Sequence, residues 1–168
     1  MKKAYLFTII IFSLTSQLLS QYKNGYIIGN NNDTTWGYIN FEGSIRNSDH
    51  CNFISMPDST HHKYYPGDII AFRFIDSKYF STDEIKIGNE QKKVFLEWLI
   101  KGRASILTYT QENTKTRYFI LPENEPLREL VNTLDIIQRN GDTYEHYKKE
   151  YVGDLKYYFK DCPEIYRG

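Results

Sequence analysis

Two apolar runs separated by a short polar turn occupy residues 94–109, near the middle of the chain. The turn contains Lys101 and Gly102, and its flanks are rich in β-branched, aromatic and aliphatic residues. A glycine that can adopt a positive φ between two such flanks predicts a β-hairpin. Both faces of the first arm are mostly apolar, which predicts a central strand that is covered on both sides.

Shorter stretches with period-two alternation surround this hairpin and are bounded by turn residues such as Asn, Asp, Gly and Pro. One of them places Trp36 and Tyr38 on one face and Gly37 and Ile39 on the other. With the hairpin we expect about eight strands, which predicts an antiparallel sandwich or partly open barrel over residues 21–122. The further predicted strands are residues 24–29, 34–41, 51–56, 69–75, 79–81, 84–87 and 116–121.

The apolar period changes from two to helical spacing after the proline pair Pro122 and Pro126. We therefore predict two C-terminal α-helices in a tail of residues 123–168, which either docks on the β domain or projects from it. The apolar positions of the first helix are Leu127, Leu130, Val131, Leu134 and Ile137, and Asn140-Gly141 would end it. The second helix would carry an interface stripe made of Tyr144, Tyr147, Tyr151, Leu155 and Tyr158.

The first 20 residues have the pattern of a secretory signal peptide. Two lysines are followed by an apolar run and by small and polar residues that end at Ser20. We expect cleavage before Gln21; the alternative is a retained membrane anchor, for which the apolar run is short. The sequence thus predicts export across the inner membrane to a periplasmic, outer-membrane-associated or secreted location, with no transmembrane span after cleavage.

The charge and composition of the chain limit the classes of molecule that it is expected to bind. The chain has 21 basic and 21 acidic residues, which argues against a nucleic-acid partner. Aromatic residues make up 16% of the chain. They have two interpretations: half-buried aromatic pairs of a strand-rich fold, or an exposed aromatic surface that binds a glycan or a protein. Tyr64, Tyr65 and Tyr79 are the candidates for such a surface.

Candidate catalytic and metal-binding residues lack the spacing that their chemistry needs. His50, His61 and His62 lie near Cys51 and two aspartates, yet no Cys-x-x-Cys or His-x-x-x-His pair occurs. The serines do not lie in a Gly-x-Ser-x-Gly turn, and no phosphate-binding glycine loop is present. The sequence therefore favours a non-catalytic protein with no metal or cofactor, and assigns no catalytic residue.

The two cysteines, Cys51 and Cys162, leave their pairing open. In an oxidising compartment they could form a disulfide that fastens the tail to the sheet. The alternatives are two separate thiols, or a Cys162 that pairs outside this chain.

Several motifs together give a family resemblance. They are Asn-Gly-Tyr-Ile-Ile-Gly from Asn24, Thr-Trp-Gly-Tyr-Ile from Thr35, Tyr-Tyr-Pro-Gly-Asp from Tyr64, Lys-Tyr-Phe-Ser-Thr from Lys78 and Val-Phe-Leu-Glu-Trp from Val94. The chain resembles uncharacterised exported β-rich proteins of Bacteroidota, some of which continue into an outer-membrane barrel. The resemblance implies the cell envelope and brings no catalytic residues.

Two functions follow as expectations. The first is an exported, non-catalytic envelope module that binds a protein or another surface component. The alternative is a glycan-binding protein, or a glycan hydrolase, that uses exposed aromatic residues. The oligomeric state and the ligand stay open at this point.

Overall fold

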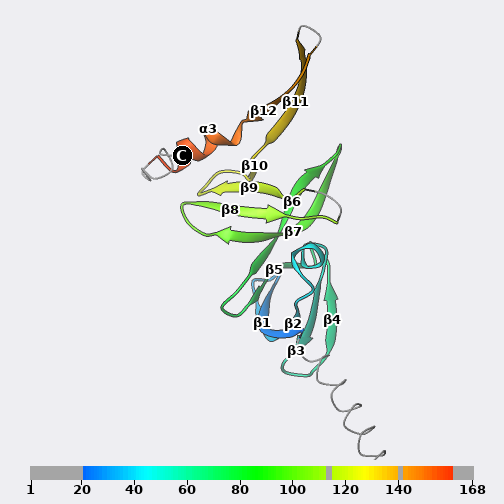
Figure 1. The fold of residues 1–168 in the computed structure, drawn as a ribbon. Helices are drawn as coiled ribbons and strands as arrows, with labels where there is room; N and C mark the ends of the chain where they lie inside the picture. Colours follow the sequence, from blue (N-terminus) through cyan, green and yellow to red (C-terminus); the bar gives the residue numbers. More distant parts are fainter. Residues whose placement is uncertain (1–20, 113–114, 140–141, 161–168) are drawn as a thin grey trace, which may run out of the picture. The chain divides into compact units, whose positions relative to one another are not determined.

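The protein is mainly β, with antiparallel strands (Figure 1). A computed structural model of the chain describes residues 21–112, 115–139 and 142–160, and only the backbone of Arg139 and Tyr147. The signal peptide predicted for residues 1–20 lies outside this part of the chain. The described residues form two compact units, of which unit 1 is 21–97 with 109–112, and unit 2 is 98–108 with 115–139 and 142–160. The boundary predicted between Pro122 and Pro126 falls inside unit 2.

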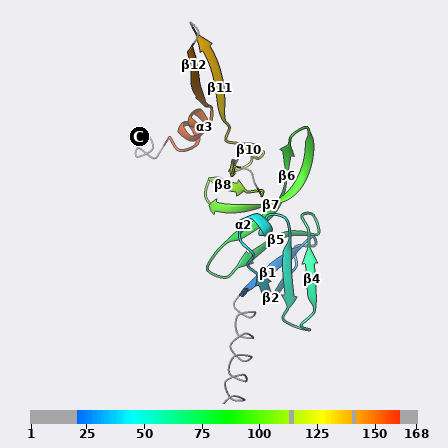
Figure 2. The same cartoon turned by 45° about the vertical axis from the view of Figure 1, so that its right-hand side comes forward.

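Unit 1 is an antiparallel sheet in the strand order β7-β6-β5-β1-β2-β3-β4, in which the chain crosses from the edge strand β4 to pair β5 with β1 (Figure 2). A short helix, α2 (Ser44–Asn47), connects β2 to β3 within the predicted loop 42–50. The strands are β1 (Tyr22–Gly29), β2 (Thr34–Asn40), β3 (Cys51–Ser55), β4 (His61–Tyr64), β5 (Ile69–Phe74), β6 (Tyr79–Ile87) and the first part of β7 (Glu90–Ile100).

Phenylalanine side chains fill the core on one face of this sheet. Phe72 stacks on Phe80, its cross-strand partner, with ring centroids 4.7 Å apart and planes 11° from parallel. Phe95 meets Phe72 edge to face at 5.0 Å. Phe53 and Phe74 are buried in the same cluster with Ile27, Ile39, Cys51 and Ile69. Each fully buried ring removes a large apolar area from water, so this face supplies most of the stabilisation of unit 1.

Two glycines make room for the core where β1 and β2 pair. Gly25 and Gly37 lie directly opposite each other. A Cβ added at Gly37 would come within 2.5 Å of the Phe53 ring and 2.1 Å of the Ile54 carbonyl oxygen. Only glycine lets the strand and the ring approach so closely.

The predicted central hairpin is confirmed as β7 and β8 (Ala104–Tyr109). Val94, Phe95, Leu96 and Glu97 are all buried, so this part of β7 is covered on both faces as expected. The positive φ expected at Gly102 is not observed, since the glycines with positive φ are Gly43, Gly67 and Gly88. Three residues connect the strands instead of the two predicted.

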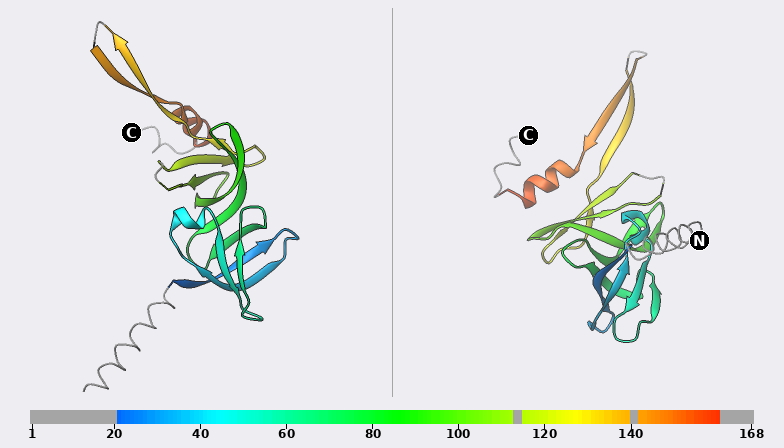
Figure 3. Two further views of the ribbon diagram at one scale, coloured as in Figure 1. Left: turned by 90° about the vertical axis from the view of Figure 1, so that its right-hand side faces the viewer. Right: turned by 60° about the horizontal axis from the view of Figure 1, so that its bottom comes forward.

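Unit 2 has the strand order β10-β9-β8-β7 and a separate two-stranded sheet, β11-β12 (Figure 3). The remaining elements are β9 (Arg117–Pro122), β10 (Arg128–Glu129), β11 (Asn132–Arg139), β12 (Asp142–Lys149) and α3 (Tyr151–Tyr158). A bidentate ion pair from Arg117 to Glu129, at 2.6 and 2.7 Å, fastens β10 to β9. The strand order of the described residues is open at both ends, so they form no closed barrel.

The prediction of a first tail helix through Leu127 and Ile137 is wrong, because β10 and β11 occupy this stretch. The second helix is confirmed only for α3, since β12 takes its first half. The spacing of Leu130, Leu134 and Ile137 also fits a strand bearing apolar residues on both faces. Asn140-Gly141, which lies outside the described residues, is a stronger hairpin signal than a helix end.

The strand count was also too low, since the described residues form twelve strands. The two pieces predicted at residues 79–81 and 84–87 are one strand, β6. Strand β4 was missed because its sequence His-His-Lys-Tyr shows no apolar alternation. No helix among the described residues is long and apolar enough to cross a membrane.

The ion pair between the half-buried Lys78 and the buried Glu97 gives a test of this fold. The Lys78 ammonium group donates to the buried Glu97 carboxylate and, at 3.0 Å, to Ser44 Oγ. Lys78→Met removes the partner of a buried charge, so we expect the free energy of unfolding to fall by about 3 kcal/mol. Urea unfolding followed by circular dichroism measures this change. The exposed Lys92 is the control, and Lys92→Met should change stability by less than about 0.5 kcal/mol. Equal effects of the two substitutions would contradict the assignment.

Candidate functional site

A row of large polar-aromatic side chains crosses four neighbouring strands of unit 1 on the face opposite the phenylalanine core. Register pairs Trp36 on β2 with Tyr26 on β1, Tyr26 with Arg73 on β5, and Arg73 with Tyr79 on β6. Directly opposed residues of an antiparallel sheet lie on the same face. We call these four residues the outer row. Three inter-strand spacings make it about 14 Å long.

The outer row is accessible but held in place. Trp36 is 51% exposed, and its ring lies 5.1 Å from that of Tyr26 with the planes inclined by 60°. Tyr38, two residues along β2 on the same face, is also exposed, as is Arg73. Tyr26 and Tyr79 are half-buried. Rings held on paired strands keep their positions without a partner, which lowers the entropy cost of binding one.

Arg73 gives the outer row its charge. Burial raises the pKa of the Tyr79 hydroxyl, the nearby Tyr26 adds to the rise, and the Arg73 guanidinium opposes it. The three side chains therefore lie within electrostatic reach of one another. At neutral pH the row carries a positive charge between two uncharged phenols.

The structure does not bring together the three tyrosines of the candidate aromatic surface, Tyr64, Tyr65 and Tyr79. Tyr64 is half-buried and packs against the core cluster, with its ring 6.3 Å from Phe53. Burial raises the pKa of its hydroxyl. Tyr65 is exposed, with the Lys63 ammonium group 5.3 Å from its ring centroid. Only Tyr79 belongs to the outer row.

The predicted tail stripe is divided between a strand and a helix. Tyr144 is exposed on β12, and the side chain of Tyr147 lies outside the described part of the chain. Tyr151, Leu155 and Tyr158 lie on α3 and are half-buried. Because a strand and a helix turn their side chains at different periods, the five residues do not form one helical stripe.

Tyr158 fastens α3 to the turn between β9 and β10. Its hydroxyl donates to Glu125 Oε2 at 2.5 Å and accepts a hydrogen bond from the Arg128 guanidinium. The hydrogen bond to Glu125 is the main cause of the raised pKa of this hydroxyl.

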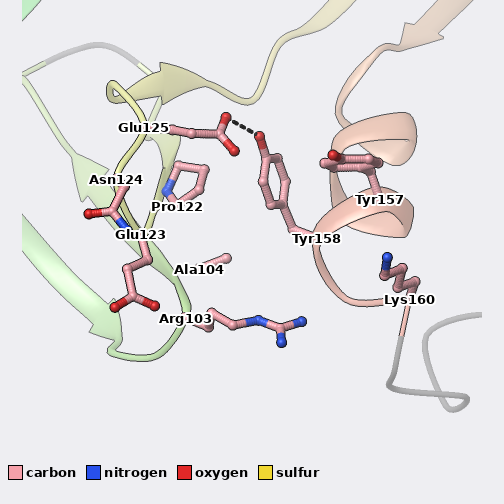
Figure 4. A pocket seen from close by; sticks show the side chains of 9 residues that line it. All are labelled: Arg103, Ala104, Pro122, Glu123, Asn124, Glu125, Tyr157, Tyr158 and Lys160. Carbon is pink, nitrogen blue, oxygen red and sulfur yellow. Dashed lines mark hydrogen bonds between the residues drawn. The ribbon is translucent and has the colours of Figure 1, made fainter.

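A pocket of about 280 Å³ lies beside this contact. Figure 4 shows Tyr158 reaching Glu125 across it, with Arg103 and Lys160 also on its walls. Its mixture of acidic and basic groups selects no single class of ligand.

His50 bridges two carboxylates. Its Nε2 lies 3.0 Å from Glu42 Oε2, and its Nδ1 lies 3.1 Å from Asp49 Oδ2. Asn52 Nδ2 donates to the same Glu42 oxygen at 3.1 Å. With both ring nitrogens engaged, His50 links the loop after β2 to β3. His61 and His62 lie on β4, and no group of three or more His, Cys, Asp or Glu suited to a metal occurs among the described residues.

Sequence reasoning missed the outer row as a unit. It placed Trp36 and Tyr38 on one face and Gly37 and Ile39 on the other, and the burial pattern of β2 agrees. The only part of the row that the sequence pattern indicated is therefore the pair Trp36 and Tyr38, on the face of β2 opposite Gly37 and Ile39. The strand order that adds Tyr26, Arg73 and Tyr79 to it is not visible in a local pattern.

Comparison of the chain with protein-family models, curated proteins and solved structures gave no match.

The reactivity of the Cys51 thiol tests whether this side chain is buried. Among the described residues Cys51 makes no disulfide and is fully buried, and burial, followed by the nearby Glu42, raises the pKa of its thiol. Cys162 lies outside the described residues, so the disulfide between them stays a prediction. Since the thiolate is the reactive form, we expect iodoacetamide to label Cys51 only after unfolding in urea. Mass spectrometry of the Cys51 peptide measures this labelling.

The same experiment separates the pairing alternatives. A free Cys51 is labelled in urea alone, whereas a disulfide with Cys162 also requires a reductant. Labelling of Cys51 at equal rates in buffer and in urea would contradict the buried thiol.

Proposed function

We propose that this protein is a non-catalytic module of the cell envelope that binds another protein through the outer row. Export is part of the proposal and rests on the sequence of residues 1–20. The observation that carries the binding function is the succession of Trp36, Tyr26, Arg73 and Tyr79 on one sheet face, in which Trp36 and Arg73 are exposed.

The residue types of the outer row support a protein partner. Trp, Tyr and Arg are the residues that most often dominate the binding energy of protein interfaces. The row lies on paired strands, so its members are presented together and in fixed order. Tyr38 and Ile75, both exposed, lie beside the row and extend its apolar area. Exposed patches of this kind usually mark interaction sites.

The pairing of His50 supports the non-catalytic part of the proposal. A general base needs a ring nitrogen that faces the reacting group. Both nitrogens of His50 face carboxylates, which suits a structural link between two segments.

A glycan is the second candidate, and the exposed Trp36 ring is the observation that favours it. Sugar rings stack on flat aromatic surfaces, and Arg73 could pair with a sugar carboxylate. The 60° inclination between the Trp36 and Tyr26 rings gives them no common plane. This geometry suits the irregular surface of a protein better than an extended flat glycan.

Binding to envelope extract tests the proposal. The mature chain is immobilised, and extract of the producing cell's envelope is passed over it in a biolayer interferometer. We expect Trp36→Ala to weaken binding about tenfold or more, since a tryptophan that dominates an interface contributes roughly 2 kcal/mol or more. Tyr118→Ala, at an exposed aromatic on β9, is the matched control and should bind as the parent does.

Pretreatment of the extract separates the two candidates. Protease should abolish the Trp36-dependent signal and periodate should leave it. A signal that periodate abolishes and protease spares would assign the outer row to a glycan. Binding that is unchanged in Trp36→Ala would remove the row from the proposal, provided that circular dichroism shows both variants folded.

A further inference from the structure

Arg73 is the only charged member of the outer row, and its side chain has no partner within the part of the chain that the structure describes. The residue is exposed and lies directly opposite Tyr26 on β1 and Tyr79 on β6. Its guanidinium makes no ion pair and no hydrogen bond with any described residue. The N–H donors of this group are therefore left to water.

The acidic residue that follows on the same face of β6 does not neutralise Arg73. Asp83 lies four residues along the strand from Tyr79. Its carboxylate accepts a hydrogen bond from Ser81 Oγ at 2.9 Å. Asp83 is half-buried, and burial raises the pKa of its carboxyl group. The positive charge of the outer row thus has no compensating carboxylate among the described residues.

A protein that covers the outer row must supply what Arg73 lacks. Covering the row takes the guanidinium out of water, and a charge that is buried without a partner is strongly unfavourable. A guanidinium pairs with a carboxylate through two parallel hydrogen bonds, which gives geometric selectivity as well as attraction. Like charge at the same place would be repelled.

We propose that the protein bound at the outer row presents a short acidic segment, in which an Asp or Glu side chain pairs with Arg73 and an apolar residue packs on Trp36. This inference rests on the binding function proposed above and names the chemistry of its partner. Trp36 supplies apolar contact area and Arg73 supplies charge selectivity, so the two residues divide the recognition between them.

The sheet also sets the distance between the two contacts. Trp36 and Arg73 are separated by two inter-strand spacings, which is about 10 Å between their Cα atoms. Residues three apart in a polyproline II segment lie about 9 Å apart on one face. Residues seven apart in an α-helix lie about 10 Å apart. We therefore expect the apolar and the acidic residue of the partner at one of these two spacings.

Selection of phage-displayed random dodecapeptides tests this chemistry. The library is selected on the immobilised mature chain, and sequences that also bind Trp36→Ala are removed. We expect Asp and Glu to be enriched severalfold in the remaining sequences, relative to the unselected library. Selection on Arg73→Glu should instead enrich Lys and Arg. Lys92→Glu makes the same charge change at an exposed position of β7, so it is the matched control and should keep the acidic preference.

A double-mutant cycle tests whether the acidic residue contacts Arg73 itself. A selected peptide is synthesised with its acidic residue and with the corresponding amide, and its dissociation constants from the parent and from Arg73→Gln are measured by fluorescence anisotropy. Each single change should weaken binding about tenfold, because hydrogen bonds between charged groups are strong. The two changes together should weaken binding little further. Losses that multiply to about a hundredfold would place the acidic residue elsewhere and overturn the inference.

The outcomes separate this inference from the binding function. Trp36-dependent sequences with no acidic preference would overturn the carboxylate partner and leave the outer row as a protein-binding surface. A library that yields no Trp36-dependent sequence, while the envelope extract still gives a Trp36-dependent signal, would also overturn the acidic segment alone. If Trp36→Ala changes neither measurement, both proposals fall. Circular dichroism of Arg73→Glu and Lys92→Glu checks that both variants are folded.

Discussion

Packing of phenylalanine rings on one face of the sheet is the interaction on which the rest of unit 1 depends. Phe72 lies between Phe80 and Phe95, and Phe53 fills the space that Gly37 leaves open. The rings come from separate strands, so the core forms only when the strands pair in their observed register. A shift of one residue would turn every ring to the opposite face.

That constraint also accounts for the opposite face. Residues that alternate with the core positions point away from it, so burial of Ile27, Phe72 and Phe80 presents Tyr26, Arg73 and Tyr79 together. The sheet needs none of these three as core. The Trp36 ring beside them is 51% exposed, and exposed aromatic surface of this kind is the physical reason for the proposed partner.

The outer row differs in kind from the polar contacts elsewhere in the chain. The outer row offers side chains fixed on a broad sheet, and a partner would bind them as an assembled patch. Polar contacts elsewhere, such as His50 with Glu42 and Tyr158 with Glu125, are already satisfied within the chain. They hold segments in place and leave binding to the outer row.

Local alternation in the sequence determined the mainly β class, most strands of unit 1 and the hairpin through Gly102, because period-two patterns reflect contacts of each strand with one buried face. It did not determine the stretch from Leu127 to Ile137, whose apolar residues fit either a helix or a strand. Tertiary structure alone decided that choice, and it alone brought Trp36, Tyr26, Arg73 and Tyr79 into one row. Such a row depends on which strands become neighbours, and that is set by long-range packing of the phenylalanine core.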